Sequence, residues 1–176
     1  PDQCFLDVVH GHEVGVDIKV PWELSRGHHL VLLAQTALLS GDEKYARECL
    51  AQMTSWIDAN PTAQGVNWAC PMDVAIRAVN WLWSLALLVE SPLMTEAWLT
   101  EVLASLVAHG RFLMGNLEVR DDGVSTNHYL ADLVGLLYLG LCLKEVREAE
   151  GWKAFAVRGL VREMDRQGLA DGMHYE

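Results

Sequence analysis

The stretch 123-GVSTNHYLADLVGLLYLGLCL-143 is almost wholly apolar from Tyr129 onward, and Asp132 is its only charged residue. A helix that is apolar over most of its circumference is buried on several sides. Two polar residues, Asn127 and His128, nevertheless stand at its beginning. The stretch therefore predicts a buried helix whose first turn presents polar side chains at one end of an apolar layer.

Five further stretches carry helical signals, in the form of apolar residues at helical spacing bounded by Pro, Gly or Asp. Strand signals are weak, because period-two alternation is rare and no Asn-Gly hairpin occurs. In chain order, the first, third and fifth helices are apolar over most of their surface, whereas the second, fourth and sixth are amphipathic and carry most of the charge. The predicted helices span about residues 21–39, 40–61, 70–92, 95–117, 123–143 and 145–167.

This alternation predicts an all-α fold of consecutive helical hairpins, arranged as an inner and an outer layer. Inner helices connected in this way run parallel, so that their N-termini lie at one end of the layer. Helix N-termini carry partial positive charge and free N–H groups, which suit an anion. The polar residues expected to meet at this end are Glu23, Arg26, His28, His29, Asn67, Asp73, Arg77, Asn127 and His128.

Each of these residues also has a purely structural interpretation. Asn127 is a good N-cap residue, although Ser125 and Thr126 are equally suited to cap the same helix. His128 alone is more typical of a hydrogen-bonded structural histidine than of a catalyst.

The third helix carries a polar stripe. Asp73, Arg77 and Asn80 follow the helical spacing i, i+4 and i+7, which predicts a partly buried ion pair of Asp73 with Arg77. Arg77 would still have donors left to hold a carboxylate in a forked geometry. Trp22 and Trp68 lie near the polar ends of the inner helices, where they either stack on sugar rings or pack in the core.

Composition narrows the class of protein. The 176 residues are 51% hydrophobic with a mean hydropathy of +0.12, which is typical of one folded domain. The formal net charge of −11 argues against binding to nucleic acid. No apolar run reaches about 18 residues without a polar break, so no membrane span is predicted. The chain begins at Pro1 without a signal pattern, which suggests an excised piece or a mature product of unknown compartment.

Metal and cofactor signals are weak. The four cysteines lie far apart without a C-x-x-C motif, and we expect Cys49, Cys70 and Cys142 to be buried free thiols. The segment 10-HGHE-13 contains metal-ligating residue types, but no second cluster accompanies it. We therefore predict no metal site and no cofactor.

Two alternative functions fit parts of the sequence. The stretch "LLSGDEKYARECLAQM" is typical of a tetratricopeptide-type turn, which favours a non-catalytic helical scaffold that binds peptides. Against it, the hairpins restart near residues 21, 71 and 125, a spacing too long for that repeat. A hydrolase would require two carboxylates across a sugar, for which Asp122 and Asp171 are available without a supporting pattern.

Four ordered motifs together carry a resemblance to a known family. They are "DIKVPWELSRGHHLVLLAQTALLSGDEKYA", "GVNWACPMDVAIRAVNWLW", "STNHYLADLVGLLYLG" and the closing "WKAFA…EMDRQ…DGMHYE". Over residues 16–176 the chain resembles the α-helical part of the heparinase II/III-like polysaccharide lyases. The resemblance implies part of an incomplete (α/α) toroid, whose cleft binds an acidic polysaccharide or oligosaccharide and cleaves it by β-elimination.

The resemblance also implies roles for individual residues. Asn127 would contact the uronate carboxylate, and His128 would line the same cleft, so that we treat both as the catalytic candidates. An amide and an imidazole that hydrogen-bond this carboxylate stabilise the negative charge that develops when the C5 proton leaves. Candidate substrate contacts are Trp22, Glu23, Arg26, His28, Asn67, Trp68 and Arg77.

The chain departs from the family pattern at its end. Family members transfer the proton with a tyrosine in a Tyr-His pair that lies beyond the stretch matched by "DGMHYE", and Tyr175 precedes that place. We also expect the β-rich domain of the family to lie outside residues 1–176. We therefore expect residues 1–176 to be one α-helical domain of a larger lyase, with little turnover alone and with self-association through exposed apolar surface. If the source is bacterial, the resemblance implies a periplasmic or secreted protein.

Overall fold

The computed structural model describes residues 3–9, 15, 17–119 and 125–174, and this part of the chain is helical with only isolated β-bridges. This confirms the predicted all-α class. The α-helices are α1 (Lys19–Ser25), α2 (His28–Ser40), α3 (Glu43–Ala59), α4 (Pro71–Leu87), α5 (Glu96–Gly115), α6 (Asn127–Cys142) and α7 (Ala149–Gln167). Two 3₁₀ turns, η1 (Phe5–Asp7) and η2 (Val66–Trp68), precede α1 and α4.

The first predicted helix is in fact two helices, because the chain breaks at Gly27. This residue has a φ of 72°, in the left-handed region that glycine adopts without strain. A Cβ atom at this position would also meet Leu30 Cδ1 at 3.1 Å. The break separates the short α1 from α2. It places Arg26, the C-cap of α1, immediately before the change in chain direction.

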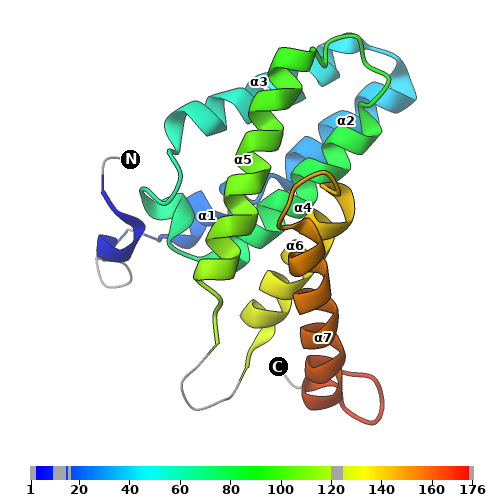
Figure 1. The fold of residues 1–176 in the computed structure, drawn as a ribbon. Coiled ribbons are helices and arrows are strands. Elements are labelled where there is room, and N and C mark those ends of the chain that lie inside the picture. Colours follow the sequence, from blue (N-terminus) through cyan, green and yellow to red (C-terminus); the bar gives the residue numbers. More distant parts are fainter. Residues whose placement is uncertain (1–2, 10–14, 16, 120–124, 175–176) are drawn as a thin grey trace.

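The helices form the predicted inner and outer layers. In the inner layer α4 packs between α2 and α6, while α3 packs on α2, α5 on α4 and α6, and α7 on α6 (Figure 1). The inner helices α4 and α6 run parallel, since Ala75 in the second turn of α4 faces Gly135 in the middle of α6, and Trp83 lies near Tyr138 further along both helices. The N-termini of these inner helices therefore lie toward one end of the layer.

Helices α4 and α6 approach each other closely at Gly135. A Cβ atom on Gly135 would lie 2.7 Å from Ala75 Cβ and 2.9 Å from Ala75 Cα, so that only hydrogen fits at this position. Leucines at 133, 136 and 139 of α6 are fully buried around this contact. The close packing fixes the position of α4 relative to α6.

The described helices also bear on three other expectations. No helix among the described residues is long and apolar enough to span a membrane. All four cysteines are free thiols, and Cys49 and Cys70 are buried, but the prediction of a buried Cys142 is wrong because this residue lies on the exposed side at the end of α6. On α7 the apolar residues Val157, Val161 and Met164 are exposed along one stripe, and self-association through such surface stays a prediction.

Candidate functional site at the N-terminal end of the inner helices

The first turn of α6 presents the two residues that the sequence singled out. Thr126 is the N-cap of α6, and its hydroxyl accepts a hydrogen bond from the backbone N–H of His128 at 3.3 Å. Asn127 is consequently the first residue inside the helix and is exposed, while the His128 side chain is 40% exposed. The N-cap role that competed for Asn127 is therefore filled by Thr126.

Glu118, in the segment that follows α5, joins the beginnings of α4 and α6. Its Oε1 lies 2.9 Å from His128 Nδ1, and its Oε2 accepts a hydrogen bond from the Met72 backbone N–H at 2.8 Å. The Glu118 backbone N–H in turn donates to Asp132 Oδ2 at 2.8 Å. Sequence analysis did not identify Glu118, because one acid after an outer helix has the pattern of an ordinary surface residue.

Two buried groups next to Glu118, Asp132 and Cys70, have raised pKa values. Burial raises the pKa of Asp132 to about 8; the hydrogen bond from the Glu118 backbone N–H opposes this rise, and the charge of the Glu118 carboxylate adds a smaller effect in the raising direction. Burial also raises the pKa of the Cys70 thiol, and the carboxylates of Glu118 and Asp73 act in the same direction. The beginnings of α4 and α6 are therefore a region of concentrated acidic groups around a single imidazole.

Arg26 connects α1 to the beginning of α4. Its Nε donates to Asp73 Oδ1 at 2.5 Å, and its Nη1 donates to Glu23 Oε1 at 2.5 Å. The predicted ion pair of Asp73 with Arg77 is wrong, because the break at Gly27 brings Arg26 to the Asp73 carboxylate instead. Spacing along one helix does not reveal a partner that arrives from another helix.

Arg77 lies in the core, with no exposed surface. Its Nε donates to His109 Nε2 and its Nη1 to Ser25 Oγ, both at 2.9 Å. The guanidinium stacks on the rings of Trp56, at 4.0 Å from the centroid, and Trp68, at 5.3 Å. Burial lowers the pKa of Arg77 to about 9, and burial together with this cation lowers the pKa of His109 well below its ordinary value. Contact of substrate with Arg77 would require the surrounding residues to move.

The remaining candidate contacts are spread over the same end of the molecule. His28 is exposed at the beginning of α2. The Trp22 indole N–H donates to the Val66 carbonyl at 2.8 Å, and the Asn67 amide donates to Asn60 Oδ1 at 2.7 Å. Trp68 is buried, and its indole N–H donates to the Asn60 carbonyl.

One pocket of about 330 Å³ lies between α1, α2 and α3. Its lining includes Asn67, His29 and Gln52, but neither Asn127 nor His128. The structure thus places Glu23 and Arg26 in an ion-paired group with Asp73, places His128 in a second group with Glu118, and leaves Asn67 on a separate pocket. The 10-HGHE-13 segment, Asp122 and Tyr175 lie outside the described residues.

Parallel inner helices, an outer layer of amphipathic helices and polar residues gathered at the inner N-termini define an (α/α) architecture with one polar end. Comparison of the sequence with family models identifies the family: residues 9–176 match Heparinase II/III N-terminus. The chain belongs to this family. Its fold is part of an incomplete (α/α) toroid, as the family resemblance implied.

Characterised relatives and solved structures agree with this assignment. The heparin-sulfate lyase of Pedobacter heparinus is 30% identical over 165 residues, which cover 91% of this chain and 24% of the relative. The corresponding lyase of Bacteroides stercoris is 26% identical over 91% of this chain and 26% of its own length. The crystal structure of heparan sulfate lyase HepC from Pedobacter heparinus superposes with a TM-score of 0.78 at 29% identity, over 93% of this chain and 26% of that one. The chain thus spans about a quarter of the length of these relatives.

Proposed function

We propose that the chain forms the carboxylate-recognition side of the cleft in a lyase that cleaves uronate-containing polysaccharide by β-elimination. The observation that carries this assignment is the exposed first turn of α6. Asn127 is exposed there, and His128 is held through Nδ1 by Glu118 while its Nε2 makes no hydrogen bond within the described residues. The relatives that are heparin-sulfate lyases act on a polymer of the proposed class.

The chemistry of elimination accounts for these residue types. The proton that leaves is on C5, α to the uronate carboxylate, and a charged carboxylate resists further negative charge. Donors aimed at the carboxylate stabilise the charge that develops on it, and such preorganised donors supply a large part of enzymatic rate enhancement. The Asn127 amide, the Nε2–H of His128 and the N-terminus of α6 are the donors that this end offers.

Glu118 orients the His128 ring through Nδ1, and Nε2 is a donor only while the ring carries both protons. A carboxylate at Nδ1 keeps a proton on that nitrogen or, after protonation of the ring, stabilises the imidazolium. In the imidazolium form Nε2 also carries a proton and donates to the substrate. Glu118 is therefore a positioning residue in this proposal, and proton abstraction from C5 is a separate role that we assign to none of the described residues.

The other candidates divide by exposure. Glu23 and His28 are exposed and Trp22 and Arg26 are partly exposed, so that a sugar chain that passes the beginning of α2 could contact each of them. Arg26 already pairs with the carboxylates of both Asp73 and Glu23, so that this group has no excess positive charge to offer a substrate carboxylate. Trp68 and Arg77, being buried, would support the cleft from below.

The test measures elimination by the full-length gene product on heparan sulfate and on other uronate polymers. Elimination creates a C=C bond conjugated to the carboxylate, which absorbs in the ultraviolet. We expect Asn127→Ala to lower kcat by roughly 100- to 1000-fold, the usual loss when one such donor is removed. The helical circular dichroism should not change, because Asn127 is not the N-cap of α6.

Two further variants sharpen this test. Asn127→Asp keeps the shape of the side chain but opposes the substrate carboxylate with a like charge, and we expect it to be at least as inactive as Asn127→Ala. Thr100→Ala, exposed on the outer helix α5, is the control and should retain full activity. Full activity of Asn127→Ala would refute the role of Asn127, and a saturated product would indicate hydrolysis instead of elimination.

A further inference from the structure

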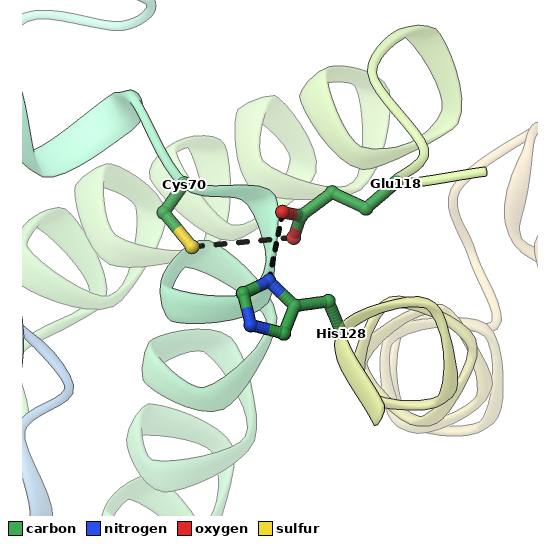
Figure 2. A group of neighbouring side chains, drawn as sticks. All are labelled: Cys70, Glu118 and His128. Carbon is green, nitrogen blue, oxygen red and sulfur yellow. Dashed lines mark hydrogen bonds and ion pairs between the residues drawn. The ribbon is translucent and has the colours of Figure 1, made fainter. Parts of the chain in front are cut away.

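Three side chains with metal-ligating atoms converge where α4 and α6 begin. Cys70 immediately precedes α4, Glu118 follows α5, and His128 lies in the first turn of α6 (Figure 2). The Cys70 Sγ, one Glu118 carboxylate oxygen and one His128 ring nitrogen all lie within 4.8 Å of one another. The residues are separated by up to 58 positions in sequence, so no sequence motif identifies them as a metal site.

The distances suit a small divalent cation. Zinc binds thiolate sulfur at about 2.3 Å and imidazole nitrogen or carboxylate oxygen at about 2.0–2.2 Å, which places tetrahedral ligand atoms roughly 3.3–3.7 Å apart. In the structure Cys70 Sγ lies 4.0 Å from Glu118 Oε2, and His128 Nδ1 lies 2.9 Å from Glu118 Oε1. The two distances involve different oxygens of the Glu118 carboxylate, but one ligand atom from each residue lies within 4.8 Å of the other two, so small rotations of the Glu118 and His128 side chains would bring the three atoms to the required spacing.

The surroundings hold the Glu118 ligand in place. Its carboxylate accepts from the Met72 N–H, and its backbone N–H donates to Asp132 Oδ2. Such outer contacts orient a ligating side chain and are typical of metal sites. With Oε1 on the ion, Oε2 keeps its bond to the Met72 N–H, so the two contacts are compatible.

The charge around the cluster favours a cation. Asp73 and Asp132 are buried beside it, and Arg26 is the cation that pairs with Asp73. Asp132 Oδ1 is buried without a hydrogen-bond partner. Without a metal, Cys70 and His128 each share a proton with Glu118 in a hydrogen bond. A divalent ion would replace these protons, and Cys70, His128 and Glu118 would all become ligands.

Access and coordination number also fit. Cys70 is buried, but the side chains of Glu118 and His128 are 25% and 40% exposed, so the cluster opens to solvent on one side. Three protein ligands with one open position are the composition of zinc sites that bind water or a further ligand. The second ring nitrogen of His128 points away from Glu118 (Figure 2), so a metal on Nδ1 leaves Nε2 free to face outward.

We propose that Cys70, Glu118 and His128 bind one divalent transition-metal ion of the zinc type, with its fourth position open at the beginning of α6. The ion would fix the relation of α4 to α6 and hold His128 with Nε2–H directed outward. This assignment rests on ligand geometry and is independent of the elimination reaction.

Cobalt(II) tests the site directly, because a cysteine ligand gives Co²⁺ a sulfur-to-metal charge-transfer band in the near ultraviolet. We expect Co²⁺ titrated into the reduced full-length gene product to produce this band, and Zn²⁺ to displace it. Cys70→Ser should abolish the band and weaken Zn²⁺ affinity on the order of 100-fold. Cys142→Ser, which removes an exposed thiol, is the matched control and should retain the band.

A double variant, His10→Asn with His12→Asn, tests whether the histidines of the segment 10-HGHE-13 contribute to Co²⁺ binding. We expect it to leave the band unchanged. Glu118→Gln provides a second test that keeps the thiol, and we expect it to weaken Co²⁺ binding at least tenfold. Absence of the band in the parent protein, or its persistence in Cys70→Ser, would overturn the proposal. Neither readout depends on lyase activity, so a failed elimination assay leaves this result interpretable.

Discussion

Two polar clusters on neighbouring inner helices, one around Arg77 in α4 and one around His128 in α6, differ above all in exposure. Arg77 is sealed between aromatic rings, with His109 and Ser25 as partners. His128 has one nitrogen against Glu118 and a side chain 40% open to solvent. Both residues stand on otherwise apolar helices, so residue type alone does not separate a structural cation from a ligand-binding group.

The difference arises from position within each helix. Arg77 lies in the second turn of α4, beneath the end of the layer, where α1 and α5 cover it. His128 lies in the first turn of α6, where Thr126 caps the helix and the layer ends. The comparison teaches that a polar residue one turn deeper stabilises the helical layer, whereas one at its rim is available to a ligand.

We expect the largest loss of stability from a substitution that disrupts the buried cluster around Arg77. Arg77→Met keeps most of the side-chain volume but leaves His109 Nε2 without a donor, and it removes one of the two donors to Ser25 Oγ, which keeps the Trp56 indole N–H. We expect the free energy of unfolding to fall by about 3 kcal/mol, measured by urea denaturation with tryptophan fluorescence. Arg111→Met, at an exposed arginine paired with Glu148, is the control and should cost less than about 1 kcal/mol. Equal losses in the two variants would contradict a structural role for Arg77.

We expect a smaller loss of stability from a substitution at the close contact between α4 and α6. Gly135→Ala drives a methyl group into the Ala75 backbone and should lower the free energy of unfolding by about 2 kcal/mol. Gly151→Ala, in α7 with no atom near the new methyl group, should be neutral or slightly stabilising. Thermal melts of both variants under one condition measure the difference. A neutral Gly135→Ala would show that α4 and α6 pack less closely.

The smallest expected effect is the contribution of His109, in the buried cluster, to the pH dependence of the free energy of unfolding. Burial and Arg77 keep the pKa of His109 well below its ordinary value, so the folded protein holds this ring neutral while the unfolded chain takes up a proton below about pH 6.5. Stability should therefore fall as the pH drops below about 6.5, by at most ~1.4 kcal/mol per pH unit from this group. His109→Gln retains an acceptor for Arg77 and should reduce this slope.

Unfolding free energies measured between pH 7 and pH 5 give the slope for each variant. His28→Gln, which removes an exposed imidazole, is the control and should leave the slope as in the parent protein. An unchanged slope in His109→Gln would mean that His109 takes up a proton in the folded state.

Much of this architecture was predictable, because helices and layers follow from local patterns. The apolar circumference of the stretches now seen as α2, α4 and α6 indicated the inner layer, and their order placed Asn127, His128 and Arg26 toward one end. Predictions failed where partners come from distant segments. The helix break at Gly27, the pairing of Arg26 with Asp73, and the position of Glu118 depend on three-dimensional contacts that residue spacing does not encode.

The roles of individual site residues were less predictable than the fold. Arg77 and His128 belonged to the same predicted end, yet burial separates them by function. The Cys70, Glu118 and His128 cluster was invisible in sequence, since its members belong to three segments, and Cys70 by itself indicated only a buried thiol.

The most direct measurement of the central idea compares two ligands that differ only in the uronate group. Calorimetry would compare the full-length gene product binding a heparan sulfate oligosaccharide with its binding of the same oligosaccharide after reduction of the carboxylates to alcohols. We expect the parent protein to bind the carboxylate form about tenfold more tightly or better, the value of a charge-assisted hydrogen bond, and Asn127→Ala to lose this preference. Equal affinity of the parent for both ligands, or an undiminished preference in Asn127→Ala, would contradict carboxylate recognition at the beginning of α6.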